Sequence, residues 1–143
     1  MIFPDVNVLI YAHDATSEFH RAASAWWEEA LANDQVFFSW QTICGFLRIA
    51  TSHRIFVNPL TLPQAVGIVE SWLELENTHI ISLDKRNWPL FAKTLIDGQA
   101  SGNLVMDAHI AAMAASCGVA VATIDRDFLR FSSVRTVDPI SKT

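Results

Sequence analysis

Three aspartates stand where carboxylates could act together. Asp5 ends the apolar opening MIFP, Asp125 comes two residues after the apolar run VAVAT, and Asp107 lies at the head of a segment whose positions 110–115 are all apolar. Unpaired carboxylates brought within a few ångströms raise one another's pKa and destabilise the fold. Mg²⁺ or Mn²⁺, which prefer hard oxygen ligands, relieve that repulsion. The three acids are therefore candidate ligands for a divalent cation, which would orient a water molecule and stabilise charge on a phosphoryl oxygen.

The segments around these acids predict that they meet. Residues 1–5 and 119–123 are short apolar runs of the kind that form strands covered on both faces. In open parallel sheets, ligands gather in the crevice beyond the carboxyl ends of the strands, so Asp5 and Asp125 are expected to face one crevice. Asp107 lies near the amino end of a helix predicted over 101–117, where the helix dipole tolerates a carboxylate.

The rest of the chain alternates short apolar runs with amphipathic segments. Strands are predicted over 36–38, 79–83 and 134–137, and helices over 17–33, 41–51, from 61, and over 87–96. Ser17 is expected to cap the first of these helices, and Gly118 to end the helix over 101–117. The alternation predicts an α/β fold with a mainly parallel central sheet, and 143 residues suit a single domain over 1–143.

Composition excludes several classes of protein. The longest uncharged apolar run, 110–124, is interrupted by Ser116 and Gly118 and is too short for a membrane span. The start MIFPD has no basic stretch before an apolar run, so no secretory signal is expected and the protein is predicted to be cytoplasmic. Cys44 and Cys117 lie in apolar contexts and are predicted to be small buried thiols. The net charge of −5 argues against a simple nucleic-acid binder, unless a bound cation cancels part of the acidic charge.

The sequence lacks the motifs of several other kinds of catalytic or binding site. The five histidines, His13, His20, His53, His79 and His109, are scattered, and the chain has no nucleophile elbow, phosphate-cradling glycine loop or dinucleotide fingerprint. A phosphoacceptor domain needs paired acids on the first strand and a Lys after the last, whereas this chain has only Asp5 there and Lys142 in its tail. Asp5-Val6-Asn7 also fails the Asp-x-Asp pattern of a haloacid-dehalogenase-type phosphatase.

Two end motifs resemble a known family. MIFPDVNVLIYA resembles the opening of PIN domains, and NLVMDAHIAAMAASCGVAVATIDRDF resembles their carboxyl-terminal signature, which ends in Thr-x-Asp-x-Asp-Phe. The middle segment GFLRIATSHRIFVNPLT is similar to the toxin branch called VapC. The likeness covers essentially the whole chain, in order.

The resemblance implies a three-layer α/β/α PIN-like fold and an endoribonuclease that depends on Mg²⁺ or Mn²⁺. VapC-like toxins act on structured RNA, including tRNA, are held inactive by a cognate antitoxin, and are commonly homodimers. By position, the family's metal-site aspartates fall on Asp5, Asp107 and Asp125, with Asp127 as a supporting carboxylate. Two further residues, Asn7 and Thr123, match positions that steady the site by hydrogen bonds.

One departure leaves two functions open. PIN nucleases generally carry a Glu on the helix after the second strand, and Gly45 stands at that place here. The chain is either a metal-dependent endoribonuclease or a catalytically weak or inactive domain that binds RNA or a protein partner. Arg48, Arg126 and Arg130 are candidate contacts for phosphate or for an antitoxin carboxylate. The tryptophans on apolar stripes, Trp26, Trp27 and Trp72, are interpreted as core or dimer interface.

Overall fold

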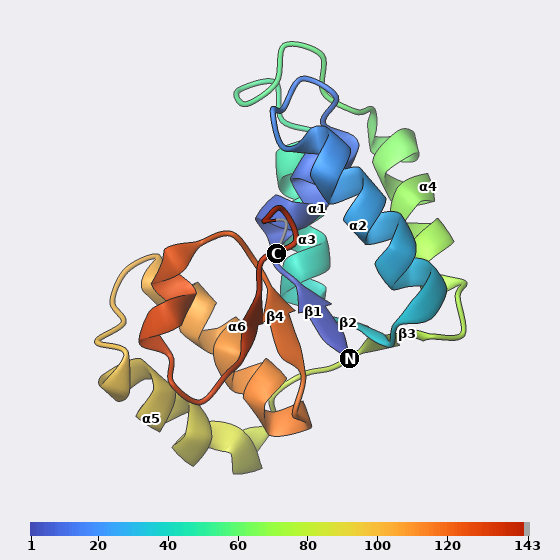
Figure 1. Ribbon diagram of the computed structural model, residues 1–143. Helices are drawn as coiled ribbons and strands as arrows, with labels where there is room; N and C mark the ends of the chain where they lie inside the picture. The colour runs from blue at the N-terminus through green and yellow to red at the C-terminus, as the bar shows by residue number, and fades with distance from the viewer. Residues whose placement is uncertain (142–143) are drawn as a thin grey trace.

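A parallel sheet forms the centre of the molecule (Figure 1). The computed structural model describes residues 1–141, so Lys142 lies outside the described part. Within it the strands are β1 (Ile2–Pro4), β2 (Val36–Phe38), β3 (Thr78–Ile80), β4 (Ala120–Ala122) and β5 (Thr136–Val137). Their order is β3-β2-β1-β4-β5, and every neighbouring pair is parallel. The predicted α/β fold with its mainly parallel sheet is confirmed.

Helices cover both faces of this sheet. One layer holds α1 (Val6–His13), α2 (His20–Asn33), α3 (Trp40–Ala50) and α4 (Leu62–Leu73), and the other holds α5 (Trp88–Asp97) and α6 (Leu104–Cys117) (Figure 1). Two 3₁₀ turns, η1 (Lys85–Asn87) and η2 (Arg126–Arg130), complete the described elements. The three layers are those that the sequence predicts.

Alternation along the strands divides the core into two clusters. In β1, Ile2 packs with the cluster under α1–α4, whereas its neighbour Phe3 packs with the cluster under α6. In β4, Val121 belongs to the α6 cluster and Ala122 to the other. Successive strand residues point to opposite faces, so apolar residues at every position bury both faces of the sheet. This burial fixes the register of β1 against β4.

Two local predictions were wrong, and one helix had no prediction at all. That helix is α1, which begins at Val6 directly after Asp5, whose carboxylate caps it. Ser17 does not cap α2, which begins three residues later; its hydroxyl accepts the backbone N–H of Phe19 instead. Both cysteines are exposed rather than buried. Apolar neighbours in sequence do not bury a helical side chain, because they lie on other faces of the helix.

The interpretation of the tryptophans agrees with the packing. Trp27 and Trp72 are buried and meet edge to face, with ring centroids 5.5 Å apart, and Trp26 packs against the same cluster. Along residues 1–141, no helix has both the length and the apolar character that a membrane crossing requires.

Candidate metal centre

The register of the two central strands places the first acid. Pro4 of β1 pairs with Ala122 of β4, and the backbone N–H of Asp5 donates to the Ala122 carbonyl over 2.9 Å. Asp5 and Thr123 are the next residues of their chains, and both leave the carboxyl edge of the sheet. Parallel pairing therefore sets these two side chains next to each other although 118 residues separate them.

A buried hydroxyl connects Asp5 to the loop that carries Asp125. Thr123 donates to Oδ2 of Asp5 over 2.9 Å, and its oxygen accepts the backbone N–H of Asp125 over 3.0 Å. Oδ1 of Asp5 accepts the N–H of Val6, the first residue of α1. Asp5 is 6 % exposed, and burial raises the pKa of its carboxyl more than these hydrogen bonds lower it. Its position is fixed on three sides.

Three other carboxylates converge beside it. Asp125 precedes η2 and accepts the N–H of Asp127 over 2.9 Å, so both aspartates lie in one tight turn. Asp107 reaches them from the first turn of α6. One carboxylate oxygen from each of Asp107, Asp125 and Asp127 lies within 4.8 Å of the others. We call these three residues the acidic trio; Asp5 borders the trio without joining it.

The electrostatics of the trio favour a cation. The pKa of Asp107 rises from the ordinary 3.8 to about 6, first because the carboxyl is half-buried and then because of the negative charges of Asp5, Asp125 and Asp127. Arg130 opposes this rise. Asp107 is therefore repelled by the three other carboxylates. A bound cation would offset this repulsion and stabilise the cluster.

A groove runs beside the acids and contains further predicted residues. Its volume is about 620 Å³, and it is lined by residues of α1, α3 and α6, among them Asp5, Asn7, Gly45, Arg48, Asn103 and Asp107. Asn7 and Arg48 are both exposed on its walls. Arg126 is exposed on η2 and is absent from the lining of this groove. Of the predicted contact residues, Arg48 therefore lies in the groove, whereas Arg126 lies on η2 outside it.

Helix α3 presents no acid to the groove. A side chain at Gly45 would begin with a Cβ 3.0 Å from Cγ2 of Val6, so the neighbouring valine already occupies much of the space there. Sequence reasoning did not identify Gln41 and Cys44, which line the same wall of α3 as Gly45 and Arg48. Their spacing of three and four residues was the available signal, since such residues share a helix face.

The family is shown by comparison with known proteins. Residues 2–134 match the model of the PIN domain. The chain is 35% identical over 136 residues to "Ribonuclease VapC37" of Mycobacterium tuberculosis, covering 94% of each chain. It is 36% identical over 140 residues to "Ribonuclease VapC31" of the same species, covering 97% of this chain and 99% of the relative.

Solved structures share the fold at lower identity. VapBC2 from Rickettsia felis, bound to a DNA fragment from its promoter, matches with a TM-score of 0.69 at 15% identity, over 96% of this chain and 98% of that one. VapBC-1 from nontypeable Haemophilus influenzae matches with a TM-score of 0.66 at 20% identity, over 99% and 100%. The resemblance carried by the two end motifs is confirmed. The chain belongs to the PIN-domain family and, within it, to the group that includes these VapC proteins.

Proposed function

We propose that the chain is the toxin of a VapBC-type toxin–antitoxin pair, a metal-dependent endoribonuclease that hydrolyses phosphodiester bonds of structured RNA such as tRNA. The convergence of Asp107, Asp125 and Asp127 beside the buried Asp5 carries this proposal. Relatives named as VapC ribonucleases over nearly the full length support the same activity. The cytoplasm is the proposed location.

The donor set fits a hard divalent cation. Every candidate ligand is a carboxylate oxygen, the class that Mg²⁺ and Mn²⁺ prefer, and no sulfur or imidazole belongs to the trio. Asp107, Asp125 and Asp127 would hold the ion, with Asp5 contributing at its border. When bound, the ion supplies stabilisation of charge on a phosphoryl oxygen and lowers the pKa of a water molecule.

The protein's own groups have separate tasks around the scissile phosphate. One carboxylate takes the proton of the attacking water, and Thr123 keeps Asp5 and the Asp125 loop in a fixed relation. Arg48 lines the groove, and we propose that its planar guanidinium donates to a phosphate of the RNA. Arg126 is exposed beside the trio and would contact phosphate or an antitoxin carboxylate, and Asn7 is exposed to the same groove.

The second candidate is a weak or inactive PIN-like domain that binds RNA or a protein partner. The tight space beside Gly45 favours it, because any side chain there would begin with a Cβ 3.0 Å from Cγ2 of Val6. Cleavage of a tRNA pool in Mn²⁺ by the parent protein and by Asp5→Asn separates the two functions. The endoribonuclease is supported when the parent cuts and the variant does not. Equal residual cutting by both proteins would reject the metal mechanism.

Partners follow from the same proposal. The substrate is RNA, and the inhibitor is a cognate antitoxin, supported by the likeness to toxin–antitoxin complexes named VapBC. A homodimer is the proposed assembly, and sedimentation of the purified chain measures it directly. A short upstream reading frame that encodes a DNA-binding antitoxin would support the toxin assignment.

Removing the hydroxyl of Thr123 tests the support beneath the acids. Thr123→Val keeps the shape of the side chain but leaves Oδ2 of Asp5 without its donor and the N–H of Asp125 without its acceptor. We expect Mn²⁺ affinity or RNA cleavage to fall by about 10- to 100-fold, the usual effect of losing a hydrogen bond behind a metal ligand. Thr123→Ser, which keeps the hydroxyl, is the control and should retain most activity. Equal losses in both variants would assign Thr123 a packing role only.

A further inference from the structure

The guanidinium of Arg130 joins the acidic trio to the end of another helix. Arg130 is the last residue of η2, and its Nη1 donates to the carbonyl oxygen of Gly98 over 2.9 Å. Its Nη2 lies 3.9 Å from Oδ1 of Asp127. Gly98 ends α5, where unpaired carbonyls and the helix dipole favour a positive charge. One side chain therefore spans from the carboxyl end of α5 to a member of the trio.

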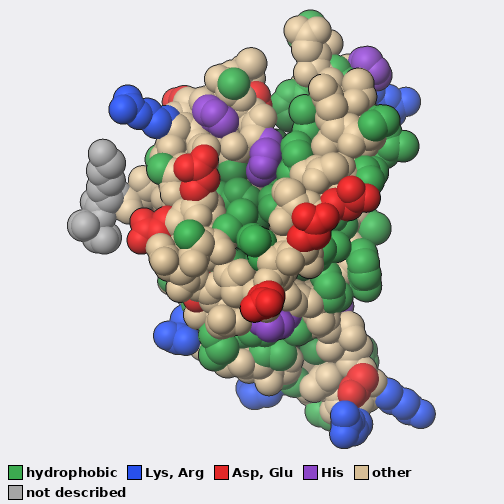
Figure 2. All heavy atoms as spheres, turned by 90° about the vertical axis from the view of Figure 1, so that its right-hand side faces the viewer, with side chains coloured by type: hydrophobic (Ala, Val, Ile, Leu, Met, Phe, Trp, Pro, Cys, Tyr) green, Lys and Arg blue, Asp and Glu red, His purple; other side chains and the backbone are tan. Residues whose placement is uncertain are grey.

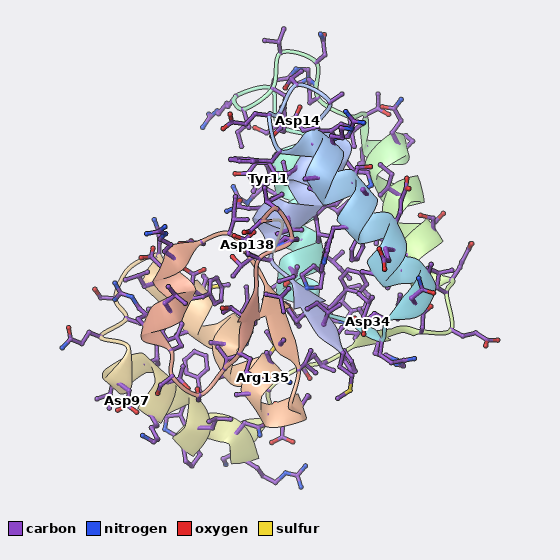
Figure 3. The ribbon with its side chains drawn as sticks, viewed as in Figure 1. Tyr11, Asp14, Asp34, Asp97, Arg135 and Asp138 are labelled. Atoms are coloured by element: carbon purple, nitrogen blue, oxygen red, sulfur yellow. The ribbon has the colours of Figure 1, made fainter. Side chains whose placement is uncertain are left out.

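Close packing at Gly98 holds the same turn against α5. A Cβ at Gly98 would lie 2.5 Å from Cε1 of Phe131, so only a glycine lets that ring approach. Phe131 and Phe128 are both buried in the cluster under α6. Asp97, labelled in Figure 3, marks the end of α5 directly before this contact. The contact of Phe131 with Gly98, the burial of Phe128 and one hydrogen bond thus hold η2 in place.

Asp127 needs such support more than the other acids do. Asp5 is held by two side-chain hydrogen bonds and Asp107 by a regular helix, whereas the side chain of Asp127 is 51% exposed in a five-residue 3₁₀ turn. Building on the proposed metal site, we propose that Arg130 is a positioning residue that holds Asp127 within reach of Asp107 and Asp125, so that the three carboxylates share one cation.

If only charge mattered, removing Arg130 would strengthen metal binding, whereas a positioning role predicts that it weakens metal binding. A guanidinium near a metal site repels the incoming cation, so its loss would tighten metal binding if charge alone mattered. If Arg130 acts by holding Asp127, its loss weakens binding despite the gain in negative potential. The direction of the change in Mn²⁺ affinity therefore separates the two roles without any measurement of RNA cleavage.

Calorimetric titration with Mn²⁺ at pH 7.5 provides the test. We expect Arg130→Ala to weaken binding by about tenfold, the low end of losses behind a metal ligand. Arg130→Lys keeps the charge but has no planar fork to span Gly98 and Asp127, so it should lose nearly as much. Gly98→Ala should weaken binding with no change of charge, because it displaces Phe131 and the turn. Arg135→Ala is the control: this exposed arginine lies near the amino end of β4 (Figure 3) and should change nothing.

A double-mutant cycle shows whether Arg130 acts through Asp127. In the Asp127→Asn background, Arg130→Ala should change Mn²⁺ affinity less than twofold, because the two residues then no longer couple. Thermal unfolding without metal identifies any variant that fails to fold, and Arg130→Lys remains informative in that event. A parent protein that binds no Mn²⁺ overturns the proposed metal site and this inference with it. A parent that binds, with Arg130→Ala binding as tightly or more tightly, overturns the positioning role alone.

Discussion

Replacing Asp107 by Asn is expected to lower the rate of RNA cleavage by about three orders of magnitude. A metal site contributes several kcal/mol to the stabilisation of a phosphoryl transition state, and each ~1.4 kcal/mol is a factor of about ten in rate. Asp107 is the one member of the trio that comes from α6, so its amide would remove a ligand that η2 cannot replace. Initial rates on a tRNA pool in Mn²⁺ measure the loss.

The same substitution is expected to stabilise the metal-free protein. Asn has nearly the shape of Asp, and it removes a carboxylate that is crowded by Asp5, Asp125 and Asp127. Glu28→Gln, which removes an exposed charge on α2, is the matched control and should alter neither cleavage nor stability. Unchanged cleavage by Asp107→Asn would contradict the assignment of this residue to the metal site. A loss of cleavage with a loss of folding would leave only a structural role.

The free energy of unfolding is expected to depend on pH through Asp107. Its pKa in the folded chain is about 6, against an ordinary value of 3.8, so the folded protein binds this proton more tightly than the unfolded chain does. The contribution to stability is fully present below about pH 4 and is lost as pH rises toward 6. Urea denaturation of the metal-free parent and of Asp107→Asn measures it, because the difference between them removes the other titrating groups.

A bound metal ion should restore the stability that the protein loses as pH rises. At pH 7.5, above the pKa of about 6 in the folded chain, Asp107 is charged beside the other carboxylates, so saturating Mn²⁺ is expected to raise the melting temperature of the parent strongly. At pH 5, protons compete for Asp107 and the rise should be smaller. Asp107→Asn should show little rise at either pH. A rise of equal size at both pH values in parent and variant would indicate that Mn²⁺ binds elsewhere.

The strand-end acids and the sheet could be predicted because their signals are local. The run VAVAT has apolar residues on both faces, which a strand covered by two layers requires, and Asp125 comes two residues after it. Asp107 could be placed near the amino end of its helix for a similar reason, since positions 110–115 have no polar face. These predictions needed no knowledge of long-range contacts.

The features that the sequence did not predict depend on contacts between segments that are distant in the chain. The composition of the trio depends on how η2 packs against α5, and the contacts of Gly98 with Arg130 and Phe131 are not encoded in a short pattern. Helix α1 was missed because its apolar residues follow a strand without a break, and only the capping by Asp5 ends that strand. The exposure of Cys44 depends on which face of α3 lines the groove. Each of these is a tertiary property.

Acidic residues elsewhere on the molecule provide an internal comparison for metal binding. The face formed by α2 and α4 carries separate Asp and Glu side chains among apolar ones (Figure 2). Its exposed acids include Glu28, Glu29, Glu70 and Glu74. Within residues 1–141 they form no group whose oxygens approach as those of the trio do. A cation that only screens charge would spread over such residues, whereas a coordinated ion would select the trio.

The most direct test of the account is an anomalous difference map from crystals of the protein soaked in Mn²⁺. We expect one strong peak among the carboxylates of residues 107, 125 and 127, at the border of Asp5, and we expect it to disappear in Asp107→Asn. A map with no peak there, or with its main peak among the acids of α2 and α4, would contradict the claim that these converging carboxylates bind the catalytic ion.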